Sequence, residues 1–290
     1  MRTMREVLEA ARKRRVGIGH FNFSDLTSLR AVVSAARQMD VPVVVGVSEG
    51  EREFIGVRQA AALVRSFREE YGVSIFLNAD HTHSLRNAEE AAHAGFDEIL
   101  FDGSGLPFDK NVSETKRAVE AIKSINPAIL VEGEVGYIGT SSSILDEPPK
   151  GLGDLTDPAE AVHFVSATGI DVLSPAVGNM HGMLRSMIKG ETKKRLDIKR
   201  IGDISKATGI LMTLHGASGT DDDDLRQAIR AGITLIHINT EIRVAWRRGV
   251  EATLSKHPDE VAPYKILPGA LDAVKEIVSA RIKLFNSPGI

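Results

Sequence analysis

Residues 74–83 of the chain are Ser74-Ile75-Phe76-Leu77-Asn78-Ala79-Asp80-His81-Thr82-His83, an apolar run that becomes polar at its end. The apolar part is near-continuous rather than alternating. That pattern is typical of a strand buried on both faces of a parallel sheet. We therefore predict a buried parallel strand over 74–79, with the polar residues at the carboxyl end of the sheet.

Similar apolar runs recur along the chain and alternate with helical patterns. The predicted strands are 16–21, 41–47, 74–79, 98–101, 128–131, 171–173, 210–214 and 233–238. Spacing of apolar residues at the helical period predicts helices over 26–39, 57–71, 85–94, 113–125, 158–168, 197–208 and 222–231. Strands that are each followed by a helix predict a (β/α)8 TIM barrel, which we expect to form a single domain over 1–290.

A doubly wound open sheet is the main alternative fold. The barrel is preferred because the candidate catalytic and ligand residues follow many different strands. In an open sheet they would gather at the one point where the strand order reverses. Residues 271–284 predict one extra C-terminal helix with apolar positions to bury. This helix either contacts another subunit of a homodimer or homotetramer, or docks on its own barrel.

Composition excludes several classes of protein. The net charge is −3 and the pI about 6.3, so no overall field favours nucleic acid or an anionic membrane. No apolar run approaches the roughly 20 residues that span a bilayer, and the start lacks the apolar core of a signal peptide, so a cytoplasmic enzyme is expected. The basic runs 12–15 and 193–195 are interpreted as solvated helix ends or loops.

Three histidines follow predicted strands, each in a short polar cluster. They are His81, His181 and His215. In a barrel the carboxyl ends of the strands meet at one mouth, so these imidazoles should converge there. Three converging imidazoles beside carboxylates predict a metal site with an open coordination position. The chain has no cysteine, so the ligands must be His, Asp or Glu.

Carboxylates also follow two of the predicted strands, 74–79 and 128–131. Glu132 and Glu134 lie on the same side of one strand, and Glu134 is nearer the mouth, so it is favoured as a ligand. Glu132 then supports the site or a proton path, or alternatively makes a buried ion pair. Asp80 precedes His81 and suits a carboxylate that moves a proton, although it could instead cap the next helix.

Glycine-rich loops predict a site for an anion. Gly182 and Gly216 each follow a candidate ligand, and Gly216-Ala217-Ser218-Gly219 offers consecutive amides and a hydroxyl. Thr240 opens the helix after the eighth strand. Loops after strands seven and eight commonly bind phosphate in barrels, so a phosphorylated substrate is expected. The irregular stretch 137–155 is interpreted as a flap over the site.

Other histidines have weaker assignments. His83 and His237 lie near the mouth and are candidates for substrate contact, whereas His20 could face either side of its strand. The remaining three, His93, His163 and His257, are interpreted as structural or exposed.

The ordered motifs resemble the class II, metal-dependent fructose-bisphosphate and tagatose-bisphosphate aldolases over nearly the whole chain. The motifs are Asp80-His81, Asp102-Gly103-Ser104, Val131-Glu132-Gly133-Glu134-Val135-Gly136, Gly178-Asn179-Met180-His181-Gly182, His215-Gly216-Ala217-Ser218-Gly219 and Asn239-Thr240-Glu241. The resemblance implies an enzyme of carbohydrate metabolism that reversibly cleaves fructose 1,6-bisphosphate into dihydroxyacetone phosphate and glyceraldehyde 3-phosphate.

The resemblance also implies roles for individual residues. One zinc ion would be held by His81, Glu134, His181 and His215, and Asp80 would shuttle the proton at the C4 hydroxyl of the sugar. The substrate would be bound by Asn22, Ser48, Gly182, Arg185, Gly216, Ala217, Ser218, His237, Asn239 and Thr240. Asp102 would lie close to the metal. A Na⁺ or K⁺ ion would assist in binding the phosphate.

The chain departs from the family pattern at four places. Asn78 replaces a histidine, and Leu235 and His237 replace a lysine and an asparagine. Gly139-Thr140-Ser141-Ser142 occupies the stretch where the family carries a loop glutamate, and Arg185 replaces a lysine. These departures leave open a tagatose-bisphosphate aldolase, a phosphosugar epimerase or hydrolase on the same metal site, or a sensor without catalytic activity.

Overall fold

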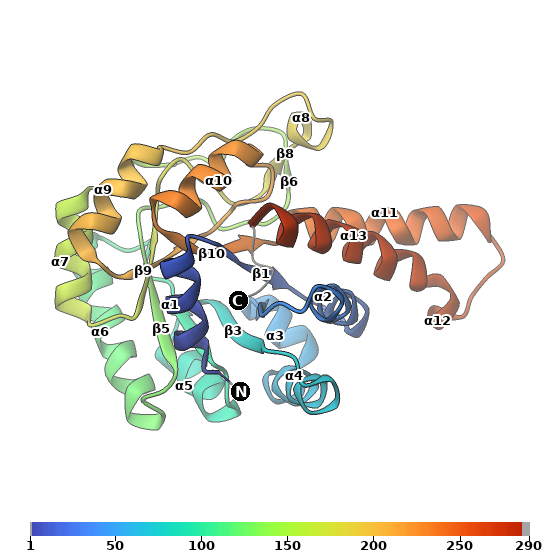
Figure 1. Cartoon of the computed structure of the whole chain (residues 1–290), viewed down its shortest axis with the longest axis horizontal. Coiled ribbons are helices and arrows are strands. Elements are labelled where there is room, and N and C mark those ends of the chain that lie inside the picture. Colours follow the sequence, from blue (N-terminus) through green and yellow to red (C-terminus); the bar gives the residue numbers. More distant parts are fainter. Residues whose placement is uncertain (1, 286–290) are drawn as a thin grey trace.

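The computed structural model describes residues 2–285 of the chain. Within them, eight parallel strands close into a barrel in the order β1-β10-β9-β7-β5-β4-β3-β2 (Figure 1). The barrel strands are β1 (Ile18–Asn22), β2 (Val43–Val47), β3 (Ile75–Thr82), β4 (Glu98–Phe101), β5 (Leu130–Val135), β7 (Val172–Pro175), β9 (Leu211–Leu214) and β10 (Ile233–Ile238). The predicted barrel is therefore confirmed, and the open sheet is excluded.

Helices surround the barrel. They are α2 (Leu26–Met39), α3 (Glu49–Ile55), α4 (Val57–Tyr71), α5 (Leu85–Ala94), α6 (Phe108–Ile125), α7 (Pro158–Thr168), α9 (Ile198–Thr208), α10 (Asp222–Ala231) and α11 (Thr240–Lys256). Five of these helices, α2, α5, α7, α9 and α10, have an amino-terminal cap whose side-chain oxygen accepts a hydrogen bond from a backbone N–H. The capping residues are Asp25, Ser84, Asp157, Asp197 and Asp221. None of these helices, nor any other described helix, is long and apolar enough to cross a membrane.

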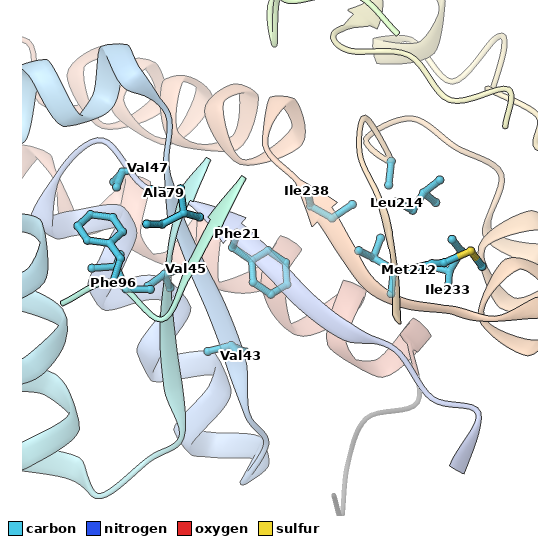
Figure 2. Packing of buried hydrophobic residues seen from close by; sticks show 14 of the residues in the cluster. Phe21, Val43, Val45, Val47, Ala79, Phe96, Met212, Leu214, Ile233 and Ile238 are labelled. Carbon is cyan, nitrogen blue, oxygen red and sulfur yellow. The ribbon is translucent and has the colours of Figure 1, made fainter. Parts of the chain in front are cut away.

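Residues along seven of the eight barrel strands divide between two apolar layers. Val43, Val45 and Val47 of β2 pack in the layer between the strands and the helices, part of which is drawn in Figure 2. Val44 belongs instead to a cluster inside the barrel. This alternation follows from the period of two in a strand, and both faces are apolar because both are buried.

The helix α1 (Met4–Arg14), which the sequence analysis did not predict, closes the amino end of the barrel. Its buried residues Met4, Val7, Leu8 and Ala11 form one cluster with residues at or near the starts of seven strands. Those partners are Ile18, Val44, Phe76, Leu130, Val172, Leu211 and Leu235. With this end covered, the opposite mouth is left for a site.

The last helices form a pair that extends from the barrel. Figure 1 shows α11 and α13 (Pro268–Phe285) side by side, with the short α12 (Pro263–Ile266) between them at the tip. A Cβ on Gly249 of α11 would lie 2.4 Å from the Gly269 carbonyl oxygen, so close packing of the pair requires glycine there. The carboxyl half of α13 buries Val278, Ile282 and Phe285 in the core. The extra helix is thus confirmed and docks on its own barrel, whereas a homo-oligomer stays a prediction.

Candidate metal and substrate site

The four predicted metal ligands meet at the carboxyl end of the barrel. His81 comes from β3, Glu134 from β5, His181 from the loop after β7, and His215 directly follows β9. One ligand atom from each lies within 4.8 Å of the other three. The strands β3 and β5 extend further than predicted, so His81 and Glu134 are strand residues that the barrel itself holds in place.

A bulge aims the first of these ligands. The register between β3 and β4 shifts between Ala79 and Thr82, and His81 has a φ of +42°. A left-handed backbone conformation is uncommon for a histidine. It persists only where the surrounding structure holds the residue in place. The bulge turns the imidazole into the cluster, where its ring centroid lies 4.6 Å from that of His181 and 4.9 Å from that of His215.

Each of the four residues directs one unpartnered, buried atom into the cluster. These atoms are His81 Nε2, Glu134 Oε2, His181 Nε2 and His215 Nδ1. Buried polar atoms are normally satisfied, so four unsatisfied donors or acceptors in one place fit a bound ion. Three imidazoles and one carboxylate form a ligand set suited to zinc and to related divalent ions. The residues present therefore fit the metal that the sequence analysis expected.

Two of the imidazoles contact a carboxylate through the ring nitrogen that does not face the cluster. His81 Nδ1 lies 2.8 Å from Asp102 Oδ2, and His215 Nε2 lies 2.9 Å from Glu132 Oε1. Such contacts fix the ring orientation and leave the other nitrogen for a metal. Glu132 thus supports the site through His215. In the part of the chain that the structure describes, no lysine or arginine forms an ion pair with Glu132, whose partner is His215.

The ionisation of the cluster is strongly perturbed. Although burial opposes its charge, the carboxylates of Asp80 and Asp102 raise the pKa of His81 to about 10. Burial and the charge of His81 lower the pKa of His215 to about 3 and that of His181 well below its usual range. Burial and Asp102 raise the pKa of Glu134 well above its usual value. A divalent cation would reverse the last shift by favouring the ionised carboxylate.

Asp80 lies beside this cluster and is 3% exposed. Its Oδ2 accepts a hydrogen bond of 2.8 Å from Asn22, and its Oδ1 lies 3.5 Å from His237 Nδ1 and 3.8 Å from His81 Nε2. Burial would raise the pKa of Asp80, but His81 and His237 hold it well below the usual value. The carboxylate is ionised and can accept a proton. It does not cap the next helix, because Ser84 does.

Two further imidazoles stack next to Asp80. The rings of His20 and His237 lie 3.4 Å apart and nearly parallel, and both are buried. His20 therefore faces the barrel interior, where its Nε2 lies 3.3 Å from Asn78 Oδ1. Asn78 also donates to Glu98 through Nδ2. Gly46 makes room for this arrangement, since a Cβ there would lie 2.2 Å from the His20 ring.

The predicted phosphate-binding residues gather on one side of the metal cluster. Gly182, Gly216, Ser218, Asn239 and Thr240 line the same narrow cavity as Asp80, His181, His215, His237 and Asn22. A Cβ on Gly216 would lie 2.3 Å from the Met180 carbonyl oxygen, and φ is +60° there. Ala217 is placed differently: its amide donates to the His237 carbonyl and its side chain is in the core.

A wider cavity of about 280 Å³ opens above the cluster. Its wall includes Ser48, His83, Arg243, and Thr140, Ser141 and Ser142 of the predicted flap. The flap is held by the short parallel pair β6 (Ile144–Leu145) and β8 (Met183–Leu184), and Asn239 Nδ2 donates to Ser142 Oγ. Arg185 does not line either cavity. Its Nε instead donates to Asp146 Oδ1 at 2.5 Å on the exposed side of the flap.

Sequence reasoning missed two charged residues at this mouth. The buried Glu51 accepts hydrogen bonds from Asn22 and from the backbone and side chain of Ser48. Arg243 in the first turn of α11 pairs with Glu51 at 2.7 Å. The spacing Ser48-x-x-Glu51, a capping-box pattern, was the available signal for Glu51.

Comparison with known proteins agrees with this geometry. A family model described as "Fructose-bisphosphate aldolase class-II" matches residues 2–290. The chain belongs to the class II fructose-bisphosphate aldolase family. It is 34% identical over 288 residues to a "Probable fructose-bisphosphate aldolase" of Bacillus subtilis (strain 168), covering 98% of this chain and 97% of that protein. A "Fructose-bisphosphate aldolase" of Thermus caldophilus is 33% identical over 306 residues, with 98% and 97% covered.

Solved structures of aldolases share the fold. The YdjI aldolase from Escherichia coli K12 superposes with a TM-score of 0.83 at 27% identity, covering 99% of this chain and 97% of that chain. A fructose-bisphosphate aldolase from Campylobacter jejuni has a TM-score of 0.81 at 18% identity, with 98% and 94% covered, and shows the likeness of fold alone. Family membership identifies the chain as an aldolase-type lyase, and this family is generally metal-dependent.

Proposed function

We propose that this aldolase reversibly cleaves fructose 1,6-bisphosphate into dihydroxyacetone phosphate and glyceraldehyde 3-phosphate with one zinc ion. The observation that carries the proposal is the convergence of four unpartnered ligand atoms beside the ionised Asp80. His81, Glu134, His181 and His215 would hold the metal. When bound, it would supply Lewis-acid chemistry that polarises the substrate carbonyl.

Asp80 is the group placed to move the proton of the reaction. Its carboxylate accepts the proton of the C4 hydroxyl, the C3–C4 bond breaks, and the electron pair moves toward the C2 carbonyl. C3 then takes up one proton to give dihydroxyacetone phosphate, which balances the proton that Asp80 has accepted. Asn22 donates a hydrogen bond to Asp80 Oδ2, and His237 Nδ1 lies 3.5 Å from Oδ1, so each oxygen of the base has a polar neighbour. Both contacts come from strands of the barrel, which keeps the base rigid relative to the metal ligands.

The two phosphates of the substrate would bind on opposite sides of the cluster. Gly182, Gly216, Ser218 and Thr240 offer backbone amides, hydroxyls and the amino end of α11 on one side. Ser48 and Arg243 line the wider cavity, where they would bind the other half of the substrate and Arg243 would supply a positive charge. Asn22, beside Asp80 in the narrow cavity, would contact the sugar. Thr140, Ser141 and Ser142 would cover the bound sugar and limit access of water.

The experiment that tests the proposal measures triose phosphate formed from fructose 1,6-bisphosphate. Protein stripped with chelator should be inactive, and added zinc should restore cleavage. A protein with full metal occupancy that forms no triose phosphate would contradict the proposal. The same assay with tagatose 1,6-bisphosphate decides between the two sugars, which differ only in configuration at C4.

The histidine stack favours one second candidate. His20 and His237 place a buried imidazole pair against Asp80, and no carboxylate of the flap lines either cavity described above. The same metal site could therefore serve an epimerase or hydrolase of phosphosugars. Solvent deuterium entering a phosphosugar, or release of phosphate, without any triose phosphate would favour that reaction over aldol cleavage.

A further inference from the structure

Lys194 occupies a position that its sequence did not suggest. It lies in the basic run 193–195, which we interpreted as solvated, but Lys194 is 4% exposed and that interpretation is wrong for it. The side chains of Lys193 and Arg195 on either side are 53% and 74% exposed and pair with Asp221 and Asp224. The chain thus turns one lysine inward between two basic residues that face solvent.

The buried ammonium lies in a cage of backbone carbonyl oxygens. Lys194 Nζ lies within hydrogen-bond distance of four carbonyl oxygens, those of Met180 at 2.7 Å, Gly182 at 2.6 Å, Gly216 at 2.8 Å and Ser218 at 2.6 Å. The three N–H groups of the ammonium are shared among these four acceptors. Its backbone is fixed as well, because its N–H donates to the Gly219 carbonyl and its own carbonyl accepts from the Asp221 N–H. The cage therefore has a rigid tether rather than a mobile side chain.

All four partners can only accept hydrogen bonds, which favours the protonated amine. Burial, opposed by Glu241, lowers the pKa of Lys194 to about 7, and the carbonyl contacts act against that shift. Within residues 2–285 no carboxylate forms an ion pair with Nζ, and Glu241 itself is bound by the Gly219 amide and by Arg281. A ring of carbonyl oxygens around one positive centre is the arrangement by which proteins replace the hydration shell of a monovalent metal ion.

The cage joins the two loops that build the site. Met180 and Gly182 flank the predicted metal ligand His181, and Gly216 and Ser218 belong to the loop that begins at His215. Gly182, Gly216 and Ser218 also line the cavity assigned to a phosphate. When the carbonyl of a peptide unit points at a cation, its N–H group points the other way, which is the direction that favours an anion. Without a cation, four carbonyl dipoles would converge and repel one another.

We propose that Lys194 is a built-in cation that replaces a monovalent metal ion in the phosphate subsite, so that this protein binds a phosphate group without Na⁺ or K⁺. Lys194 acts as a positioning residue: it holds both loops and adds positive charge behind the amides that face the anion. The assignment of the anion as a substrate phosphate rests on the proposed function. The cage and its cation do not.

The test compares wild type with Lys194→Ala in choline chloride, free of alkali ions, and then with added KCl, NaCl or NH₄Cl. The readouts are the thermal midpoint and the affinity for inorganic phosphate by calorimetry, neither of which requires turnover. In choline, Lys194→Ala should bind phosphate roughly 10-fold or more weakly, because a charge-assisted contact is lost. K⁺ or NH₄⁺ should restore its affinity and raise its midpoint saturably, whereas wild type should not respond.

Two further variants make the result specific. Lys194→Met fills the cage without charge, so alkali ions should not rescue it. Lys193→Ala removes the neighbouring exposed lysine and should behave as wild type in every salt. If Lys194→Ala does not fold, the test uses wild type only. Its affinity for phosphate should then be the same in choline chloride and in KCl.

Saturable stimulation of wild type by K⁺ or Na⁺ would overturn the proposal, as would a Lys194→Ala protein that binds phosphate like wild type in choline. Failure of the proposed function gives a different result. In that case wild type would not cleave fructose 1,6-bisphosphate with zinc bound, while the salt dependence of the midpoint and of phosphate binding would still follow the expectations for the cage.

Discussion

His215 Nε2 lies 2.9 Å from Glu132 Oε1, and both side chains are fully buried. A histidine that binds a metal through Nδ1 must carry its proton on Nε2, so Glu132 accepts that proton's hydrogen bond and fixes the tautomer. Burial and the charge of Asp80 raise the pKa of Glu132 well above its usual value. A cation held at His215 favours the ionised carboxylate, which couples the state of Glu132 to metal binding.

Glu132→Gln should therefore weaken metal binding by about 10- to 100-fold, a typical effect of losing a partner behind a ligand. The metal-free fold should be little affected, because the amide resembles the protonated carboxyl group. Metal affinity measured by competition with a chelator checks this. Glu98→Gln is the matched control: Glu98 is also buried, but it contacts Asn78 rather than a ligand. Equal losses in both variants would contradict the role given to Glu132.

Asp80→Asn should lower kcat by roughly 10²- to 10⁴-fold, the usual contribution of a positioned general base. The amide keeps the contact with Asn22 but cannot accept a proton from the substrate. Metal content, measured alongside by elemental analysis, should stay at the wild-type level because Asp80 is not among the four proposed ligands. A variant that retains wild-type kcat would remove Asp80 from the reaction.

The fold could be predicted from the sequence because its signals are local. Each barrel strand is a short, near-continuous apolar run, and α2, α4, α5, α7 and α10 begin and end at the predicted residues. The helix α1 was missed although Thr3 and Glu6 form a capping box at its start. It depends on packing against the open end of the barrel, which appears only once the barrel has closed.

The candidate site could be predicted in part. Parallel strands bring their carboxyl ends together whatever their order, so the convergence of His81, Glu134 and His215 followed from topology alone. Burial at one loop position could not be predicted, because a run of Lys and Arg gives no sign of which member turns inward. Lys194 shows this most clearly. Arg185 is the opposite case. Its position in the family motif predicted a substrate contact, but its side chain is exposed and lines neither cavity.

Metal binding should release at least one proton near pH 7. In the metal-free protein the pKa of His81 is about 10, so its imidazole is protonated at neutral pH and must lose that proton to bind a metal. His215, with a pKa of about 3, is already neutral and releases none. Apparent affinity should accordingly fall as the pH is lowered from about 10 through 7.

Calorimetry in two buffers of different ionisation enthalpy measures the protons released. The value should be smaller for His81→Ala, which retains the other three ligands. Zero proton release at pH 7 in wild type would show that His81 is neutral without metal. The carboxylates of Asp80 and Asp102 would then not hold a charged imidazole as described.

Gly182 and Gly190 offer a comparison of two glycines with nearly the same backbone. Their φ values are +76° and +78°, so alanine at either position costs about 1–2 kcal/mol of backbone energy. A Cβ at Gly182 would also lie 2.7 Å from the Ser143 carbonyl oxygen and 2.9 Å from that of Ser141, whereas nothing lies within 4 Å at Gly190. Gly182→Ala should therefore displace the flap, and Gly190→Ala should not. We expect Gly182→Ala to lose more stability than Gly190→Ala in thermal melts, because the clash adds to the backbone strain that both variants share, and only Gly182→Ala to raise KM for the phosphorylated substrate. A KM that rises equally in both would mean that backbone strain, rather than contact between Gly182 and the flap, controls substrate binding.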